Sequence, residues 1–388
     1  MTFSTRALPV SIAKGHFTGF SPASVTICSY DWATTNARLI TQPFDLLVLD
    51  EAHYLKNPAA KRTQSVLAKL AHQATTVFAL TGTPAPNNSS ELWPMLFTFG
   101  LTPKTFAQFV AHYCVSIRKD NRDVIVGNQN VEELRQLLSP FMMRRTKAEV
   151  LPDLPPIMFS DFVVEPGEVD LERYFADKDA VKELHIVRRE IAEHSKTLED
   201  VGKMTRGESN RQLGAIEGMV KAMPTLRRYM GAQKVEAMVE LVTSEFEAGA
   251  YDKLVIFAMH MVVIEELRYR LRKYNPVTLY GGTSPTKRQA NIDRFQKDPK
   301  CKVFIGQVQA AGTAINLTAA HHVLFAEYDW VPANNAQAAM RCHRIGQTSP
   351  VFVRFAVAAG VIDEVVLKVV RRKSKELAQI FDPVDIFA

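Results

Sequence analysis

Apolar residues gather in short runs that alternate with stretches of helical spacing along most of this chain. Strand-like runs cover residues 24–30, 45–50 and 76–82, and residues 59–73, between the last two, have helical spacing. The pattern over residues 104–150 is mostly helical and closes in a proline cluster. This alternation indicates an α/β arrangement in the first part of the chain.

The carboxyl-terminal part repeats the alternation with five further strand candidates. Short apolar strands that are connected largely through helices predict a parallel sheet with both faces covered. The runs are KLVIFAM (253–259), PVTLYGG (276–282), KVFIGQV (302–308), HHVLFAEY (321–328) and PVFVRFAV (350–357).

Residues 165–230 have a different pattern. They are rich in charge, carry apolar residues at helical spacing and contain no convincing strand run. Charge runs of this kind are most often a solvated face, so we assign them no chemistry. The sequence predicts an α/β fold with a first lobe over residues 1–156, a helical insertion or linker over 157–230 and a second lobe over 231–388.

Composition narrows the class of protein. Apolar residues make up 47% of the chain and charged residues 23%, which is ordinary for a globular protein. No apolar run approaches the roughly 18 residues of a membrane span, and the first residues lack the apolar core of a signal peptide. Cys28, Cys114, Cys301 and Cys342 lie far apart, which disfavours a zinc site or a disulfide framework and fits an intracellular protein. The net charge of +6 permits contact with a polyanion but does not require it.

Two adjacent carboxylates follow the predicted strand at residues 45–50. Four apolar residues lead directly into Asp50 and Glu51. Because the carboxyl ends of buried parallel strands form the ligand-binding edge of α/β sheets, both acids are expected at such an edge. Adjacent acids suit a magnesium nucleotide, since one can hold the metal or its water and the other can accept a proton from an attacking water.

Residues 330–351 contain the most informative polar pattern. A proline near the start and a glycine near the end predict one helix, and Gln337, Arg341 and Arg344 would project from one face of it. Such a face needs an anionic partner if it is buried, and two arginines beside a nucleotide would neutralise charge on the γ-phosphate. The alternative is a surface helix with ordinary exposed arginines.

Several motifs in this order and spacing resemble the helicase-like ATPases of the Swi/Snf family in superfamily two. The ending RCHRIGQTSPV is highly specific, because ordinary RNA helicases and DEAH-box helicases end their last motif differently. The VIFAMH strand and the compact insertion are most similar to the annealing-helicase (HARP-like) branch. The resemblance implies two RecA-like parallel-sheet lobes, the first incomplete, with a helical insertion between them. The motifs are LDEAHYLKN (49–57), LTGTPAPNNSSELW (80–93), FMMRRTKAEVLPDLP (141–155), GTAINLTAAHHVLF (312–325) and QAAMRCHRIGQ (337–347).

The resemblance implies roles for residues of the first lobe. Asp50 and Glu51 match the acids that handle magnesium and the attacking water, and His53 matches the histidine that couples this site to the rest of the lobe. Taken alone, His53 is more often a structural histidine. The motif that couples the state of the nucleotide to lobe movement is matched by Thr81, Gly82 and Thr83.

The resemblance also implies roles in the second lobe. Arg341 and Arg344 match the catalytic arginines that reach ATP, and Gln337 and Gly312 match residues on the nucleotide side. Trp330 matches an aromatic residue that lies near DNA, although without the resemblance it would be a core residue. A loop that touches the DNA backbone is matched by Gly281, Gly282 and Thr283, which could otherwise form a simple turn.

The sequence departs from the family pattern in three places. The glycine pair expected before the GLNL motif is replaced by Ala310 and Ala311, with Ala314 inside the motif, and Val331 stands where the family has asparagine. These changes weaken the expected coupling between the state of the nucleotide and lobe movement more than they affect the fold. Nothing matches the phosphate loop GxxxxGK[ST], and residues 13–19 (AKGHFTG) hold a lysine and two glycines in the wrong order.

The sequence therefore predicts the carboxyl-terminal portion of a DNA-dependent ATPase or DNA translocase that uses ATP and Mg²⁺. We expect it to bind double-stranded or branched DNA independently of sequence, and to be inactive without a polypeptide that supplies the phosphate loop. The alternative is an ATPase-dead remnant that binds DNA or a partner. An RNA helicase is disfavoured by the HRIGQ ending.

Overall fold

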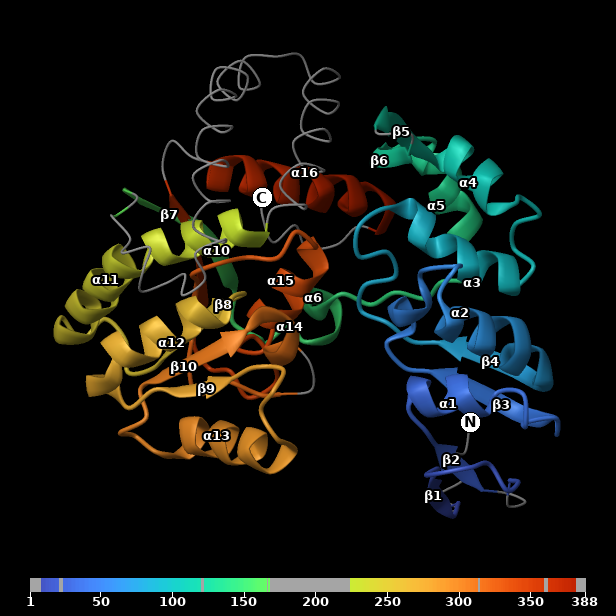
Figure 1. Ribbon diagram of the computed structural model, residues 1–388, viewed down its shortest axis with the longest axis horizontal. Coiled ribbons are helices and arrows are strands. Elements are labelled where there is room, and N and C mark those ends of the chain that lie inside the picture. Colours follow the sequence, from blue (N-terminus) through green and yellow to red (C-terminus); the bar gives the residue numbers. More distant parts are fainter. Residues whose placement is uncertain are drawn as a thin grey trace. The chain divides into compact units, whose positions relative to one another are not determined.

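The computed structural model describes residues 8–20, 24–119, 122–165, 167, 224–312, 315–358 and 362–381. It divides into two compact units (Figure 1). The amino-terminal unit comprises residues 1–114 and 128–130, and the carboxyl-terminal unit comprises residues 115–127 and 131–388. Most of the predicted helical insertion, residues 168–223, lies outside the described residues.

The amino-terminal unit contains two small parallel sheets. Strand β1 (Val10–Ile12) pairs with β2 (Val25–Ile27), and β3 (Phe44–Leu49) pairs with β4 (Ala74–Ala79). The strands predicted at residues 24–30, 45–50 and 76–82 are thus present, whereas β1 was not predicted. Helix α1 (Tyr30–Asn36) and the helical stretch of α2 (Lys61–Ser65), η2 (Val66–Leu70) and η3 (Ala71–Gln73) accompany the strands.

The sheet of β3 and β4 is buried on one face and exposed on the other. Leu49 packs with Leu67 and Leu70 of the helical stretch, because alternate side chains of a strand point to opposite faces. On the other face Leu46 is 49% exposed and Phe78 is 54% exposed. The parallel strand expected to be buried is therefore buried on one face only. Among the described residues two strands make up this sheet, and α1 and η2 pack on one face of it.

Residues 89–150 continue with short helices and one strand pair. The mostly helical pattern predicted for residues 104–150 missed β5 (Cys114–Lys119) and β6 (Arg122–Asn128), which pair with each other. Both strands carry β-branched residues, which favour extended backbone, and their pairing partner is not visible in the local pattern. The helices of this region are η4 (Ser89–Leu92), α3 (Trp93–Thr98), α4 (Phe106–Tyr113), α5 (Val131–Leu138) and α6 (Lys147–Val150).

A six-stranded parallel sheet forms the centre of the carboxyl-terminal unit, which confirms the predicted α/β fold. Its strand order is β7-β12-β11-β8-β10-β9. All five predicted strands are present as β8 (Leu254–Ala258), β9 (Val277–Leu279), β10 (Val303–Gln307), β11 (His322–Phe325) and β12 (Val351–Ala358).

The sixth strand, β7 (Ile157–Val164), lies at the edge of the sheet and was missed. It pairs with β12 over its whole length, from Ile157 opposite Val351 to Val164 opposite Ala358. The prolines before it indicated a linker, and the predicted insertion began at residue 157. The sheet of the second lobe thus includes a strand from the first residues of the predicted insertion.

Helices cover both faces of this sheet. Val255 and Phe257 of β8 point to one face and pack with α13, α15 and α16, whereas Leu254 and Ile256 point to the other face and pack with α11 and α12. None of the described helices is long and apolar enough to cross a membrane. The helices of the unit are α10 (Pro224–Gln233), α11 (Val235–Glu247), α12 (Met261–Arg270), η5 (Arg272–Tyr274), α13 (Pro285–Lys297), α14 (Val308–Ala311), α15 (Pro332–Ala339) and α16 (Ile362–Phe381) (Figure 1).

Candidate functional site

The carboxyl end of β3 presents two acidic residues in a constrained turn. Asp50 follows the strand and accepts the backbone N–H of Glu51 with Oδ1 at 3.0 Å, while the Tyr30 hydroxyl donates to the Asp50 carbonyl at 2.8 Å. Glu51 has a left-handed backbone with φ of 49°. A residue other than glycine in this conformation costs on the order of 1 kcal/mol, and such strain is concentrated at functional sites. The turn leaves the carboxylate of Asp50 exposed and that of Glu51 partly exposed.

His53 connects this turn to the end of β4. Its Nδ1 lies 3.2 Å from Oε2 of Glu51 and 3.0 Å from the hydroxyl of Thr81. The Thr83 hydroxyl lies 3.5 Å from the same nitrogen, and the Thr83 N–H donates to the Thr81 hydroxyl at 3.1 Å. Burial, together with the nearby Lys56, lowers the pKa of His53, which favours the neutral ring. The structure therefore brings together the predicted acids, histidine and threonines, and Gly82 lies exposed between the two threonines.

The two predicted arginines of the carboxyl-terminal unit do not lie on a helix. Helix α15 ends at Ala339, so the prediction of one helix up to Gly346 is wrong. From the turn that follows, Arg341 donates from Nη2 to the Gly312 carbonyl at 2.5 Å, and Arg344 donates from Nη1 to the Ile315 carbonyl at 3.0 Å. Both guanidinium groups are thus directed to the segment that contains Gly312.

Tertiary hydrogen bonds explain why α15 ends early. The carbonyls that would accept helical N–H groups are bonded elsewhere: that of Arg341 to the N–H of Leu317 at 2.9 Å, and that of Cys342 to the side-chain amide of Gln347 at 3.0 Å. The His343 carbonyl accepts the ammonium of Lys147 at 2.6 Å. The last carbonyls of α15 itself are satisfied locally, since those of Ala338 and Ala339 accept the N–H groups of Arg341 and Cys342, whereas the carbonyls beyond the helix have partners from distant parts of the chain.

Gly312 and Gln337 lie in the same region. A Cβ atom at Gly312 would stand 2.8 Å from the Val308 carbonyl oxygen, so this position requires glycine. Gln337 is half-buried on α15, one turn before Arg341. Ala311, one of the departures from the family pattern, is buried at the end of α14, whereas Ala314 lies outside the described residues.

The predicted DNA-contacting loop is an exposed turn after β9. The N–H of Thr283 donates to the Tyr280 carbonyl at 2.9 Å, and the Thr283 hydroxyl accepts the N–H of Tyr280 at 3.1 Å. Gln307 accepts the N–H of Gly281 at 3.0 Å, so that donor already has a partner. The backbone of Gly282 is exposed beside it.

Trp330 lies in the core rather than on the surface. It is 5% exposed and belongs to the core cluster beneath α15 and α16. The guanidinium of Arg227 lies over its ring at 5.2 Å. This placement does not support direct contact of the Trp330 ring with DNA.

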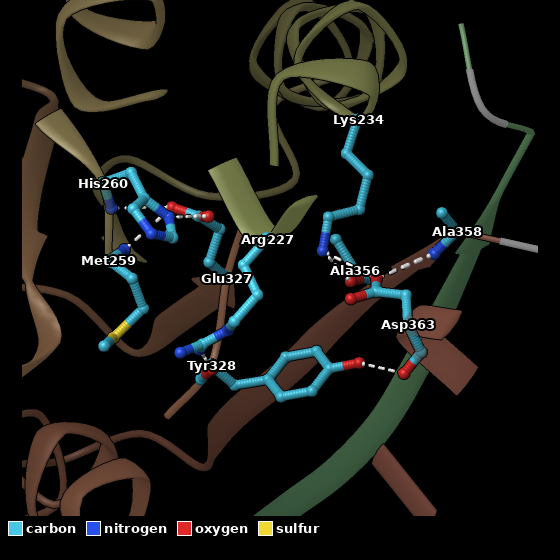
Figure 2. Close-up of polar contacts among 9 residues, drawn as sticks. All are labelled: Arg227, Lys234, Met259, His260, Glu327, Tyr328, Ala356, Ala358 and Asp363. Atoms are coloured by element: carbon cyan, nitrogen blue, oxygen red, sulfur yellow. Dashed lines mark hydrogen bonds and ion pairs between the residues drawn. The ribbon is translucent and has the colours of Figure 1, made fainter. Parts of the chain in front are cut away.

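Sequence reasoning missed a buried polar network at the carboxyl ends of β8 and β11 (Figure 2). Glu327 accepts the N–H groups of Met259 and His260 at 2.9 Å each, and its Oε1 lies 2.6 Å from Nδ1 of His260. Burial raises the pKa of Glu327, but the hydrogen bonds from His260 and the backbone outweigh it and leave the pKa below the usual range. The available signal was the same as for Asp50: a polar residue directly after an apolar strand.

Comparisons with known proteins agree with the motifs. The profile of the SNF2-related domain matches residues 16–222, just over half of the chain, and that of the helicase conserved C-terminal domain matches residues 233–346. The "SWI/SNF-related matrix-associated actin-dependent regulator of chromatin subfamily A-like protein 1" of Drosophila melanogaster is 30% identical over 362 residues, which cover 92% of this chain and 44% of that protein. The human "DNA annealing helicase and endonuclease ZRANB3" is 30% identical over 369 residues, which cover 92% of this chain and 32% of that protein.

Among solved structures, the Sulfolobus solfataricus SWI2/SNF2 ATPase core in complex with dsDNA is 24% identical, with a TM-score of 0.36 and coverage of 92% of this chain and 73% of that chain. The present chain spans less than half the length of the curated relatives named above. Two features of the structure agree with this match: the turn of Asp50 and Glu51 (the acidic turn) and the turn that carries Arg341 and Arg344 (the arginine turn). The match to the SNF2-related domain shows that the chain belongs to the Swi/Snf family of helicase-like ATPases.

Proposed function

We propose that this chain works as part of a Swi/Snf-type DNA-dependent ATPase that couples ATP hydrolysis to movement on, or remodelling of, intracellular DNA. The observation that carries the proposal is the cluster of Glu51, His53, Thr81 and Thr83 beside Asp50. An acid held next to a histidine, at the end of a parallel strand, suits activation of water. The arginine turn supplies the second requirement of phosphoryl transfer, which is positive charge.

The acidic turn fits a magnesium ion. Asp50 and Glu51 offer carboxylate oxygens, the ligands that this hard cation prefers. Bound magnesium nucleotide would supply the phosphoryl group that is transferred. Glu51 would accept a proton from the attacking water at its carboxylate. His53 would hold that carboxylate in place and connect it to the Thr81 hydroxyl.

We further propose that another polypeptide segment supplies the phosphate loop. The 388 residues contain no GxxxxGK[ST] motif, and backbone N–H groups and a lysine are needed to hold the β- and γ-phosphates. The exposed face of β3 and β4 supports this proposal, because Leu46, Val48 and Phe78 are each about half exposed. A segment that brings a further strand and its loop would cover such apolar surface.

Duplex or branched DNA is the proposed partner. A relative is named as a DNA annealing helicase, and the net charge of +6 suits a polyanion. The exposed turn at Gly281–Thr283 would contact phosphates, which carry no sequence information. We leave the buried Trp330 out of the proposed DNA contacts.

The second candidate is an ATPase-dead module that binds DNA or a partner without turnover. The absence of GxxxxGK[ST] from the sequence favours it. The two candidates differ in whether an added phosphate loop restores hydrolysis.

The test is phosphate release by purified residues 1–388 with duplex DNA, with and without an added fragment that bears a phosphate loop. We expect negligible turnover by the chain alone and DNA-stimulated turnover after addition of the fragment, because positioning of the phosphates is most of this catalysis. Glu51→Gln should abolish the restored turnover. DNA binding without turnover in both samples would favour the second candidate. Turnover by the lone chain, absent in Glu51→Gln, would show that its phosphates are held elsewhere.

A further inference from the structure

The short helix α6 attaches to the turn that carries the two arginines. Lys147, its first residue, donates from Nζ to the His343 carbonyl at 2.6 Å and to Sδ of Met340 at 3.1 Å. His343 lies between Arg341 and Arg344 in sequence. The ammonium group of Lys147 therefore holds the backbone from which both guanidinium groups extend.

Two further contacts fix the segment around Lys147 against the same turn. Nε2 of His343 donates to the Pro155 carbonyl at 2.6 Å, so His343 binds this segment through both its side chain and its backbone. The N–H of Val351 donates to the Pro156 carbonyl at 2.9 Å, where the β7–β12 pairing begins. Residues 147–156 and 340–351 are thus joined at several points.

The start of α6 is defined locally as well. The Thr146 hydroxyl accepts the N–H of Glu149, and the Glu149 carboxylate accepts the N–H of Thr146 at 2.6 Å, which makes a capping box. The four-residue helix therefore has a fixed beginning, and Lys147 leaves it from a defined position. A side chain as long as lysine would otherwise have considerable rotamer freedom.

The location of Lys147 is costly for a cation. Burial, and then repulsion from Arg344 and Arg341, lowers its pKa to about 8. A neutral donor would satisfy the His343 carbonyl without this repulsion. A positive charge is nonetheless favourable at the end of a helix, and here it lies after α15.

We propose that Lys147 is a positioning residue for Arg341 and Arg344, which it acts on by holding the His343 carbonyl. The effect of Lys147 on ATP turnover rests on the proposed function. Its effect on the structure of the arginine-bearing turn does not. The guanidinium groups reach the carbonyls of Gly312 and Ile315 from a turn that has a non-helical path. Loss of Lys147 leaves the His343 carbonyl without its donor and loosens that path.

Hydrogen–deuterium exchange of the full chain tests the structural part. The amides of Arg341, Cys342 and Gln347 are bonded within the turn. In Lys147→Met we expect their exchange to become roughly tenfold faster, as for loss of about 1.4 kcal/mol of local protection, with the amides of β10 and β11 unchanged. Lys147→Arg, which keeps a charged donor, should remain close to wild type. The exposed Lys300 provides the matched control, and Lys300→Met should change nothing in the turn.

A pH series keeps the proposal testable if Lys147→Met does not fold. The groups that face Lys147 are Arg341, Arg344 and His343, and burial lowers the pKa of His343, so that its ring does not titrate between pH 7 and 9. Between pH 7 and 9 the protection of the turn, corrected for intrinsic exchange, should rise in the wild type, because the pKa of Lys147 is lower in the closed turn than in the open one, and it should stay constant in Lys147→Arg. Unchanged exchange in Lys147→Met would overturn the proposal. So would the same change in turn protection between pH 7 and 9 in the wild type and in Lys147→Arg.

The turnover arm uses the chain with its added phosphate-loop fragment. Lys147→Met should lower kcat at least tenfold with little change in KM for ATP, because the loss concerns the position of the arginines, and Lys147→Arg should restore kcat. If the wild-type chain shows no turnover with the added fragment, the proposed function is wrong, and the exchange measurements still decide the role of Lys147. A fall in kcat in both variants would contradict the positioning role.

Discussion

The ammonium nitrogen of Lys234 lies 2.8 Å from a carboxylate oxygen of Asp363, in a place where the lysine side chain is only 1% exposed (Figure 2). Lys234 also donates to the Ala356 carbonyl at 2.9 Å, and Asp363 accepts the N–H of Ala358 at 3.0 Å. The pair joins the start of α11 to the start of α16 at the carboxyl end of β12. Within the described part of the chain the two charges are satisfied by each other and by backbone groups, and the ammonium of Lys234 also lies 5.4 Å from the centre of the Tyr328 ring, so neither charge can be removed alone without cost.

Lys234→Met should destabilise the protein by about 3–5 kcal/mol, because it leaves the Asp363 carboxylate buried without its partner. Urea unfolding followed by circular dichroism measures this change. Replacing both residues, as in Lys234→Met with Asp363→Leu, should cost less than the sum of the single changes. The matched control is the exposed pair of Lys273 and Glu247, where Lys273→Met should not shift the urea midpoint measurably. An equally small effect of Lys234→Met would contradict the buried-pair interpretation.

The stability of the protein should fall as the pH is lowered from about 6.5 to about 4. Burial, and then repulsion from His321 and Arg354, lowers the pKa of His322 to about 4. Between these values the unfolded chain binds a proton at this ring and the folded chain does not, so acid favours unfolding. His322 stacks on Phe352 with ring centroids 5.0 Å apart, and His322→Phe should keep the stack and reduce the pH dependence. Urea midpoints measured from pH 7 to 4 test this, with the exposed His72→Gln as control. An unchanged pH profile in His322→Phe would refute it.

The second lobe should require β7 to fold well. A fragment of residues 157–388 contains all six strands, whereas one of residues 231–388 leaves the β12 edge unpaired over eight residues. We expect a cooperative thermal transition for the longer fragment and a lower Tm, or aggregation, for the shorter one. Equal transitions in both fragments would mean that β7 contributes little to the core.

Arg341→Ala and Arg344→Ala should affect turnover far more than stability. Each arginine donates a hydrogen bond to a backbone carbonyl, and such a bond contributes about 1 kcal/mol. Positive charge from such a residue is worth roughly a thousandfold or more in rate. Thermal melts of the full chain and phosphate release with the added phosphate-loop fragment separate the two effects. Retained turnover would favour the alternative of ordinary surface arginines.

DNA binding should be independent of sequence and weakened by salt. The exposed turn at Gly281–Thr283 would address phosphates, and no base-reading motif is present in the sequence. Binding isotherms on unrelated duplexes across a salt series should show similar affinities and a linear fall of log K with log salt. A preference for one duplex that persists at every salt concentration would disprove this.

The sequence alone was sufficient for features that depend on neighbouring residues. The five predicted strands of the second lobe are found because each is a short apolar run, and β8 is buried at every position. The acidic turn after β3 and the threonines after β4 follow the same rule, since parallel strands bring their carboxyl ends to one edge. His53 and Thr81 therefore meet where the motifs placed them.

Only the tertiary structure decided features that depend on partners far away in sequence. Strand β7 exists because β12, almost 200 residues later, offers a free edge, and no local pattern can reveal that pairing. Helix α15 ends before Arg341 because the carbonyl groups of residues 341–343, which a longer helix would use, accept hydrogen bonds from Leu317, Gln347 and Lys147. Trp330 is buried, and one face of β3 is exposed, for the same reason: burial is set by which elements pack together, and local periodicity states only which side chains share a face.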